Sequence, residues 1–317
     1  MMTLNKVLVA QKAPQEALAI LEPYAEIVRI REGDVDDLRD KIVDCQAVLL
    51  GTWLSFTAEL MEIAKKLKII SRTGVGVDSV DVAAATVRGI YVLNTPGVNS
   101  ITVAEHALGL MIALAKYIVF LDQQVRNGLF KARRLNLPSD LNEKTVGVVG
   151  FGAIGRILAE KCRLAFNMNV LVYDPFVSEW PDWVQPTKDV EEVFKHSDFI
   201  SLHIPLTEQT KNIINEHSLS LMKPTAFLIN TSRGGLVNEA ALYACLNEKK
   251  IAGAGLDVFE KEPIPQDDQL LTLPNVVVTP HSGALTRECA QRVALCAAQG
   301  IADYFQGKTP AHIYNRM

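Results

Sequence analysis

Long basic blocks, paired cysteines and uninterrupted apolar stretches are all missing from this sequence. The formal net charge is −4 over 317 residues, and without a basic block neither nucleic acid nor an acidic membrane is an expected partner. The five cysteines are scattered, odd in number and form no C-x-x-C pair. We therefore expect no disulfide framework and no metal site, and a reducing, cytoplasmic location fits this pattern.

No apolar stretch is long enough to predict a membrane-spanning helix. The longest, near Ala107–Leu121, is interrupted by Lys116 and is predicted to be a buried or interface helix. The first ten residues form a short strand-like run without the apolar core of a signal peptide. Apolar residues make up 49% and charged residues 21% of the chain, which is typical of a globular protein of two domains at this length.

The sequence does contain a glycine-rich turn in mid-chain, between an apolar strand pattern and a helix pattern. Residues 146–155 read Val-Gly-Val-Val-Gly-Phe-Gly-Ala-Ile-Gly, which places a G-x-G-x-x-G pattern at Gly150, Gly152 and Gly155. These glycines allow, in turn, a tight turn off the strand, close approach of a pyrophosphate and close packing of helix on sheet. The free N–H groups at the helix N-terminus favour that anion.

An acidic residue stands at the matching position after the turn. Asp174 follows Gly155 by nineteen residues and ends a second apolar run, Asn169–Asp174. A carboxylate at that strand end can bind both hydroxyls of an adenine ribose. The next residues are Pro-Phe-Val-Ser, with no Arg or Lys to neutralise a 2′-phosphate. The pattern therefore predicts a dinucleotide cofactor and favours NAD(H) over NADP(H).

Strand and helix patterns alternate on both sides of a break at Asn94–Gly97, which predicts two parallel sheets covered by helices. In the first segment the predicted strands are Lys6–Ala10, Glu26–Ile30, Ala47–Leu50, Ile69–Ser71 and Tyr91–Leu93, and the helices are Pro14–Leu21, Ala58–Lys66 and Val80–Arg88. After the break, the strands are Val146–Val149, Asn169–Tyr173, Phe199–Leu202, Ala226–Asn230, Ala252–Asp257 and Val276–Thr279, and the helices are Ser100–Leu121, Ile154–Phe166, Glu239–Asn247 and Thr286–Phe305.

We therefore predict an α/β fold of two doubly wound parallel-sheet domains with a cleft between them. Residues 1–97 plus 286–317 form a flavodoxin-like substrate domain, which has no glycine fingerprint at its first turn. Residues 98–285 form an inserted Rossmann domain that binds NAD.

Three polar stretches follow predicted strands in the second half of the chain and carry an arginine, an acid and a histidine. Arg233 can bind a carboxylate or polarise a carbonyl, and His281 can exchange a proton with an alcohol or ketone near neutral pH. Glu262 beside it would favour the imidazolium and fix the ring. Taken singly, each is more readily explained as a turn or surface residue. Their joint occurrence on strand ends after a dinucleotide fingerprint favours a hydride-transfer site.

The other histidines are weaker candidates. His203 follows the strand Phe199–Leu202 and is expected to line the cofactor pocket. The remaining four are interpreted as structural or solvent-facing: His106, His196, His217 and His312.

With these motifs in order, the chain resembles the D-isomer-specific 2-hydroxyacid dehydrogenases over almost its full length. The matching segments are Arg72–Asp78, Asn94–Gly97, Val103–His106, Gly150–Gly155, Asp174, Asn230–Gly235, Asp257–Pro263 and Pro280–His281. The resemblance implies Arg233, Glu262 and His281 as the catalytic set. It implies a homodimer joined through the cofactor domains, which would explain the apolar segment Ser100–Leu121.

The same resemblance implies roles for the ligand-binding residues. The amides of Val75 and Gly76 would bind the substrate carboxylate, with Arg72 nearby. On the cofactor side, Asp174 would bind the adenosine ribose. Ala153 and Ile154 would lie at the pyrophosphate, and three residues would join Arg233 near the nicotinamide: Thr231, Ser232 and Asp257.

The substrate stays open between several acids. Among family members the chain looks most like short-form D-3-phosphoglycerate dehydrogenases, and Arg72, Arg133 and Arg134 could supply charge for a phosphate. The loop at Gly51 carries Trp53 and no arginine, which favours the alternative, a glyoxylate/hydroxypyruvate-type reductase or another unphosphorylated 2-hydroxyacid dehydrogenase. An alternative of another class is an NAD(H)-responsive, corepressor-like binding protein.

Overall fold

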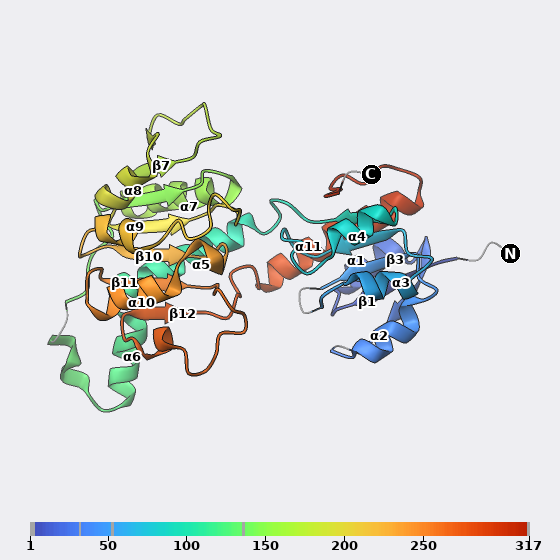
Figure 1. Cartoon of the computed structure of the whole chain (residues 1–317), viewed down its shortest axis with the longest axis horizontal. Coiled ribbons are helices and arrows are strands. Elements are labelled where there is room, and N and C mark those ends of the chain that lie inside the picture. The colour runs from blue at the N-terminus through green and yellow to red at the C-terminus, as the bar shows by residue number, and fades with distance from the viewer. Residues whose placement is uncertain (1–3, 32, 52–53, 135–136, 316–317) are drawn as a thin grey trace. The chain divides into compact units, whose positions relative to one another are not determined.

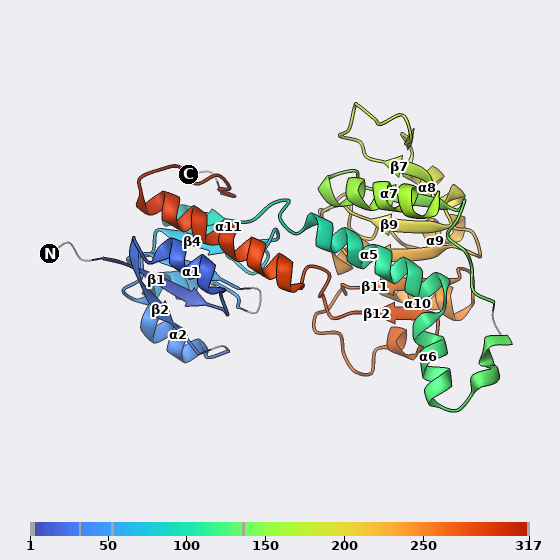
Figure 2. The ribbon, with the colours of Figure 1, turned by 180° about the vertical axis from the view of Figure 1, so that it is seen from behind.

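The chain forms two compact units, each built on one parallel sheet (Figures 1 and 2). The computed structural model describes residues 4–31, 33–51, 54–134 and 137–315. The first unit contains the chain up to Asn99 and again from Leu285 onward, and the second unit is Ser100–Ala284.

The first unit has a five-stranded parallel sheet in the order β2-β1-β3-β4-β5. This is the flavodoxin-like order that the sequence predicts. Its elements are β1 (Asn5–Ala10), α1 (Gln15–Leu21), β2 (Ala25–Arg29), α2 (Val35–Ile42), β3 (Ala47–Leu50), α3 (Ala58–Ile63), β4 (Ile69–Arg72), α4 (Val82–Val87), β5 (Tyr91–Leu93) and α11 (Arg287–Phe305).

The long C-terminal helix α11 supplies much of one face of that sheet. Thr286 caps it, because the threonine side chain accepts a hydrogen bond from the amide of Cys289. Small buried residues such as Ala297 and Ala298 let the helix approach the strands closely, and Ser71 of β4 donates a hydrogen bond to the Ala297 carbonyl at 2.8 Å. Helix α1 packs beside it on the same face, as Figure 2 shows.

The second unit has a seven-stranded parallel sheet in the order β12-β11-β10-β9-β6-β7-β8. From β6 the chain adds β7 and β8 toward one edge of the sheet. It then returns to place β9 on the other side of β6, as in a Rossmann fold. Its elements are α5 (Ser100–Ala115), α6 (Ile118–Arg126), η1 (Phe130–Arg134), β6 (Thr145–Val149), α7 (Ala153–Phe166), β7 (Asn169–Tyr173), β8 (Gln185–Thr187), α8 (Val190–His196), β9 (Phe199–Leu202), α9 (Glu216–Leu221), β10 (Phe227–Asn230), η2 (Gly234–Leu236), α10 (Glu239–Asn247), β11 (Gly253–Leu256), η3 (Gln269–Thr272) and β12 (Val276–Val278).

Helices cover both faces of this sheet. Helices α5 and α7 pack on one face, seen in front in Figure 2, and α8, α9 and α10 pack on the other, seen in front in Figure 1. The strands are short and mostly buried on both sides, which explains their continuous apolar runs.

The predicted single helix Ser100–Leu121 is wrong. It breaks at Tyr117, whose φ of 51° is left-handed, and α5 and α6 are bent by 57° relative to each other. Helix α5 has nine buried residues, whereas none of α6 is buried. By length and apolar composition no single described helix could span a membrane, although the bent α5–α6 pair together passes that test.

Candidate active site

The predicted site residues of the second unit follow strands that all run in one direction. The glycine turn follows β6 and Asp174 follows β7, while the segments at Arg233, Asp257 and His281 follow β10, β11 and β12. Because all seven strands pair in parallel, these strand ends share one edge of the sheet. That carboxyl edge is where open α/β sheets bind ligands.

The glycine turn has the shape that a pyrophosphate needs. Gly150 has a φ of 98°, and a Cβ there would lie 2.5 Å from the His203 carbonyl oxygen. A Cβ at Gly155 would overlap the Gly150 carbonyl, whereas one at Gly152 would meet only open space. The first bond of the α7 ladder runs from the Arg156 amide to the Gly152 carbonyl at 3.0 Å. The three amides before it therefore face an open approach, which fits a bound anion.

Asp174 is tied to this turn by its own carboxylate. One oxygen accepts the Phe151 amide at 2.8 Å and the other accepts the Phe176 amide at 2.9 Å. Each carboxylate oxygen can accept a further bond, so the side chain can still bind ribose hydroxyls. The donor set at β6 and β7 thus fits a dinucleotide with an unphosphorylated ribose.

The turn after β10 is organised by a buried amide. Asn230 accepts the Ser232 amide at 3.0 Å and donates to the Arg233 carbonyl at 2.8 Å. The Ser232 hydroxyl donates to the Leu202 carbonyl, and the Thr231 hydroxyl is buried without a hydrogen-bond partner among the described residues. A Cβ at Gly234 would overlap the backbone of Phe259, so glycine here lets the arginine turn pack against the loop that leads to Glu262.

Asp257 is the centre of the next loop. Its carboxylate accepts the Thr279 hydroxyl at 2.6 Å and the amides of Ser282 and Gly283, each at 2.8 Å. Its side chain is only 2% exposed and lies 3.4 Å from Nε2 of His106. Burial raises the pKa of this carboxyl, but the hydrogen bonds to it outweigh burial and hold the pKa below its usual value.

The single proton of the Thr279 hydroxyl decides whether Nε2 of His106 is a donor or an acceptor. Its Nε2 lies 2.9 Å from the Thr279 hydroxyl, whose one proton is donated to Asp257. The hydroxyl must therefore accept at His106, and Nε2 carries a proton. The sequence predicts this histidine only as structural or solvent-facing. In the structure it supports the carboxylate that holds the His281 loop.

His281 and Glu262 lie in direct contact. Nδ1 of His281 is 2.6 Å from Oε2 of Glu262, and Oε1 of the same carboxylate accepts the Phe259 amide at 3.0 Å. His281 has a left-handed φ of 51°, which costs a non-glycine residue about 1 kcal/mol. Its amide is held by the Asp257 carbonyl at 2.8 Å. With Nδ1 on the carboxylate, Nε2 is the nitrogen left to exchange a proton.

In the first unit, the predicted substrate loop follows β4. The Asn94 side chain donates to the Val75 carbonyl at 2.8 Å, and the Thr95 amide donates to the Gly74 carbonyl at 3.0 Å. A Cβ at Gly74 would overlap the guanidinium of Arg72. The carbonyl groups of this loop are thus held by hydrogen bonds from Asn94 and Thr95. Trp53, whose bulk argues against a phosphorylated substrate, lies outside the described residues.

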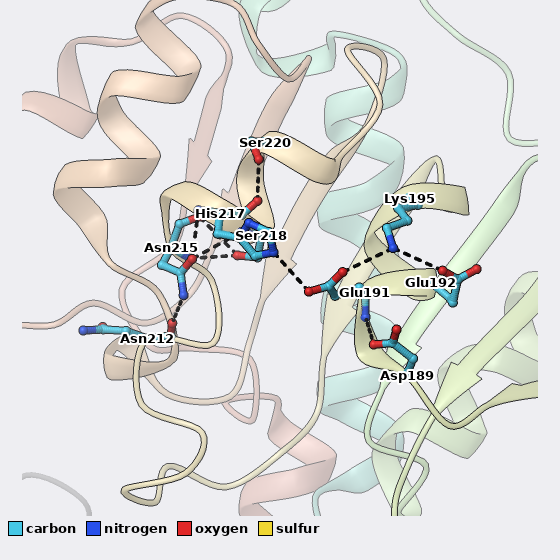
Figure 3. Close-up of polar contacts among 9 residues, drawn as sticks. All are labelled: Asp189, Glu191, Glu192, Lys195, Asn212, Asn215, His217, Ser218 and Ser220. Carbon is cyan, nitrogen blue, oxygen red and sulfur yellow. Dashed lines mark hydrogen bonds and ion pairs between the residues drawn. The ribbon is translucent and has the colours of Figure 1, made fainter.

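Of the remaining histidines, His203 directly follows β9, whereas His196 and His217 lie in exposed contacts with glutamates. His203 bonds to the Ser201 hydroxyl at 2.8 Å, and burial lowers its pKa to about 4. His217 is 3.0 Å from Glu191, in an exposed cluster with Lys195 that Figure 3 shows. His196 pairs with Glu192 at 3.1 Å. Among the described residues, no group of three His, Cys, Asp or Glu side chains could hold a metal ion.

The second unit also matches a known protein family. The profile of the NAD binding domain of D-isomer specific 2-hydroxyacid dehydrogenases matches residues 108–283. The chain belongs to this family. Its second unit is the family's NAD-binding domain, and NAD is the cofactor.

The relatives that match almost the whole chain are named either as phosphoglycerate dehydrogenases or as glyoxylate reductases. D-3-phosphoglycerate dehydrogenase of Methanocaldococcus jannaschii is 39% identical over 313 residues, 98% of this chain and 59% of that protein. Glyoxylate reductase of Korarchaeum cryptofilum is 39% identical over 319 residues, 98% of this chain and 96% of that protein. Among solved structures, the TT0316 protein of Thermus thermophilus has a TM-score of 0.89 at 36% identity, covering 98% of this chain and 100% of its own. The chain thus spans less than two thirds of the phosphoglycerate dehydrogenase.

The lowered pKa of His203 predicts how folding stability depends on pH. In the unfolded chain, His203 takes up a proton below its ordinary pKa of 6.5. In the folded chain it does so only below about pH 4. Folding stability should therefore fall as the pH drops from 6.5 to 4, by roughly 3 kcal/mol from this group alone. His203→Gln should flatten that part of the profile in urea denaturation of the second unit. His217→Gln, on the surface, is the control, and an equally steep profile in His203→Gln would contradict the prediction.

Proposed function

We propose that the protein is an NAD-dependent dehydrogenase that interconverts a D-2-hydroxy acid and its 2-keto acid. The contact of 2.6 Å between His281 and Glu262 carries the proposal, because an imidazole held by a carboxylate is a proton donor and acceptor suited to neutral pH. It lies at the sheet edge that also presents the glycine turn and the Arg233 turn. Membership of the family supports the same reaction class.

Each catalytic residue has a distinct task in this proposal. In the reductive direction, Nε2 of His281 donates a proton to the keto oxygen, and in the oxidative direction it takes the proton from the hydroxyl. Glu262 stabilises the imidazolium and fixes the ring. Arg233 binds the acid group and polarises the adjacent carbonyl. In the first unit, the amides of Val75 and Gly76 bind the substrate carboxylate, with Arg72 beside them.

The cofactor, when bound, supplies or accepts the hydride. The amides of Ala153 and Ile154, framed by the glycines at 150, 152 and 155, would hold its pyrophosphate, and Asp174 would bind the ribose hydroxyls. Thr231 and Ser232 would lie near its nicotinamide end, where the unpartnered Thr231 hydroxyl offers a donor. His203 stays assigned to the cofactor pocket, as a half-buried residue directly after β9 whose Nε2 contacts the Ser201 hydroxyl.

We assign Asp257 a positioning role. Its carboxylate already has hydrogen bonds from Thr279, Ser282 and Gly283, and its side chain is 2% exposed. The carboxylate holds the Thr279 hydroxyl before His281 and two backbone amides after it, and Nε2 of His106 lies 3.4 Å from the same carboxylate. The family resemblance implies a place for this residue at the nicotinamide, whereas these contacts favour a role through His281.

Two substrate classes fit the relatives. The names of the matching proteins include both a phosphoglycerate dehydrogenase and a glyoxylate reductase. A reductase of glyoxylate or hydroxypyruvate is the candidate that the absence of an arginine in the loop at Gly51 supports. 3-Phosphoglycerate is the alternative, which requires a binding site for a second anionic group.

We further propose that the protein is a cytosolic homodimer joined through its NAD-binding units. Helix α6 extends from the body of the second unit (Figure 1) and has no buried residue, although Ile118, Val119 and Val125 are apolar. Leu129 and Phe130 continue this exposed apolar surface. The five cysteines are all free, which fits a reducing compartment.

The proton role of His281 can be tested directly. His281→Ala should lower kcat for glyoxylate or hydroxypyruvate reduction by roughly 100-fold or more, because the proton donor is lost. NADH affinity, measured by fluorescence titration, should stay within about twofold, since the glycine turn is untouched. His217→Ala is the surface control. Unchanged turnover in His281→Ala would overturn the assignment.

A second variant separates the two roles open to Asp257. In Asp257→Asn, an amide replaces an acceptor that faces several N–H and O–H donors, so the His281 loop should shift. We expect kcat to fall roughly tenfold or more, with a displaced pH–rate profile and nearly unchanged NADH affinity. Asp182→Asn, exposed in the same unit, is the control. Weakened NADH binding with normal kcat and pH profile would instead make Asp257 a cofactor contact.

The proposed dimer surface predicts a change of oligomeric state. Val125→Glu on α6 should convert the dimer to a monomer in sedimentation experiments, because a charge would be buried against the partner. Val87→Glu, on α4 of the first unit, is the matched control, as Val87 is 87% exposed. A dimer that persists in Val125→Glu would place the contact elsewhere.

A further inference from the structure

An aromatic cluster joins the glycine turn to the loop between β7 and β8, and the roles proposed above assign it nothing. Phe151 lies between the first two glycines of the turn, and its side chain is only 1% exposed. Two half-buried rings of the loop pack on it. Trp180 lies at 5.4 Å between ring centroids with the planes inclined by 32°, and Trp183 lies at 6.5 Å, edge to face. Both distances are typical of attractive aromatic pairs.

Two arginines of helix α7 complete this cluster. The guanidinium of Arg156 lies over the Phe151 ring, 4.6 Å from its centroid, and Nε of the same side chain donates to the Phe151 carbonyl at 2.8 Å. The guanidinium of Arg163 lies over Trp183, 5.4 Å from the ring centroid. Such contacts of a cation with a ring face are attractive. The glycine turn, α7 and the β7–β8 loop therefore meet at Phe151.

The backbone of Phe151 connects the cluster to the carboxylate of Asp174. The Phe151 amide donates to Oδ2 of Asp174 at 2.8 Å. Asp174 begins the loop that carries Trp180 six residues later. The loop is thus attached to Phe151 twice, by a carboxylate at its start and by a ring further along. Because two attachments restrict a loop more than one does, the ring packing limits the positions that the carboxylate can take.

The sheet itself gives this loop little support. β8 has three residues, none of them buried, and it is the edge strand beside β7. Two hydrogen bonds inside the loop are local, since the Phe176 amide donates to Asp174 and the Val184 amide donates to the Pro181 carbonyl at 2.9 Å. The aromatic cluster therefore ties the later part of the loop to the body of the second unit.

We propose that Trp180, by packing on Phe151, positions the Asp174 carboxylate for the ribose hydroxyls of NAD(H). This inference rests on the proposed function, in which Asp174 binds that ribose. Trp180 is a positioning residue, because it acts through Phe151 and Asp174. Without its ring the carboxylate takes several positions relative to the glycine turn. Cofactor affinity then falls, since binding must order a site that was ordered before.

A double-mutant cycle on the full chain tests this coupling. The Kd for NADH is measured from the emission of NADH itself in the wild type, Trp180→Leu, Asp174→Ala and the double variant. Trp180→Leu should raise Kd roughly fivefold in the wild-type background, as the loss of an aromatic pair predicts. In the Asp174→Ala background the rise should be less than about twofold, because the carboxylate through which the ring acts is gone.

Three further variants complete the design. Trp180→Phe keeps an aromatic ring and should hold Kd within about twofold of the wild type. Tyr304→Leu is the matched control, since it removes a half-buried ring that packs on Tyr91 at 5.8 Å in the first unit, and it should leave Kd unchanged. Trp183→Leu removes the second ring from Phe151. It should give a smaller rise in Kd that is again lost in the Asp174→Ala background, and it tests the proposal even if Trp180→Leu fails to fold.

The outcomes separate this inference from the proposed function. Equal rises of Kd in both backgrounds, or a lower Tm in Trp180→Leu with an unchanged Kd, would overturn the positioning role. An unchanged Kd in Asp174→Ala alone would overturn the ribose assignment, and the inference with it. If the cycle shows the coupling but no 2-keto acid is reduced, the dehydrogenase proposal fails and the positioning role stands, because binding is measured without turnover.

Discussion

Parallel pairing of strands is the constraint on which the rest of this molecule depends. In a parallel sheet all strands end at the same edge, and each connection must cross back to the opposite edge before the next strand begins. In the second unit this brings the turns after five strands to one edge, although they are spread over more than a hundred residues of sequence. The glycine turn, Asp174, Arg233, Asp257 and His281 all follow strands of this one sheet. The first unit obeys the same rule, so the loop after β4 lies at the carboxyl edge of its own sheet.

Carboxylates at that edge serve the backbone as well as any ligand. Asp174 receives the amides of Phe151 and Phe176, and Asp257 receives those of Ser282 and Gly283. Loop amides that have no strand partner need an acceptor, and an ionised carboxylate offers several lone pairs in one place. These hydrogen bonds tie loops that have no regular secondary structure to the carboxylates at the sheet edge. His281 keeps a left-handed backbone for this reason.

Much of the fold can be predicted from the sequence because buried parallel strands leave clear apolar runs. Ala47–Leu50, Tyr91–Leu93 and Phe199–Leu202 are predicted with the bounds that the structure has. The short helices α2, α8 and α9 are missed, since six to eight residues give too little periodicity among charged neighbours. The α5–α6 break is missed because the left-handed Tyr117 interrupts an apolar pattern that continues on both sides.

Part of the candidate site can be predicted from the sequence, and part cannot. Glycines and strand-end charges stand out in sequence, and the pairing of His281 with Glu262 is predictable from them. The support that His106 gives to Asp257 is not, since a histidine within an apolar helix pattern does not show which residue of a distant loop it meets. Its partner lies about 150 residues further along the chain, and the fold alone brings them to 3.4 Å.

The late position of α11 has a consequence for how the chain is made. Residues of β1, β3 and β4 share a hydrophobic core with Ala294, Ala298 and Ile301 of that helix. The second unit is complete at Ala284, before any of α11 exists. All residues of the inserted unit are therefore synthesised while the first sheet still lacks the helix that covers part of one face. The first unit begins translation earliest and completes its core last, so the apolar face beneath α11 stays open to solvent throughout synthesis of the inserted unit.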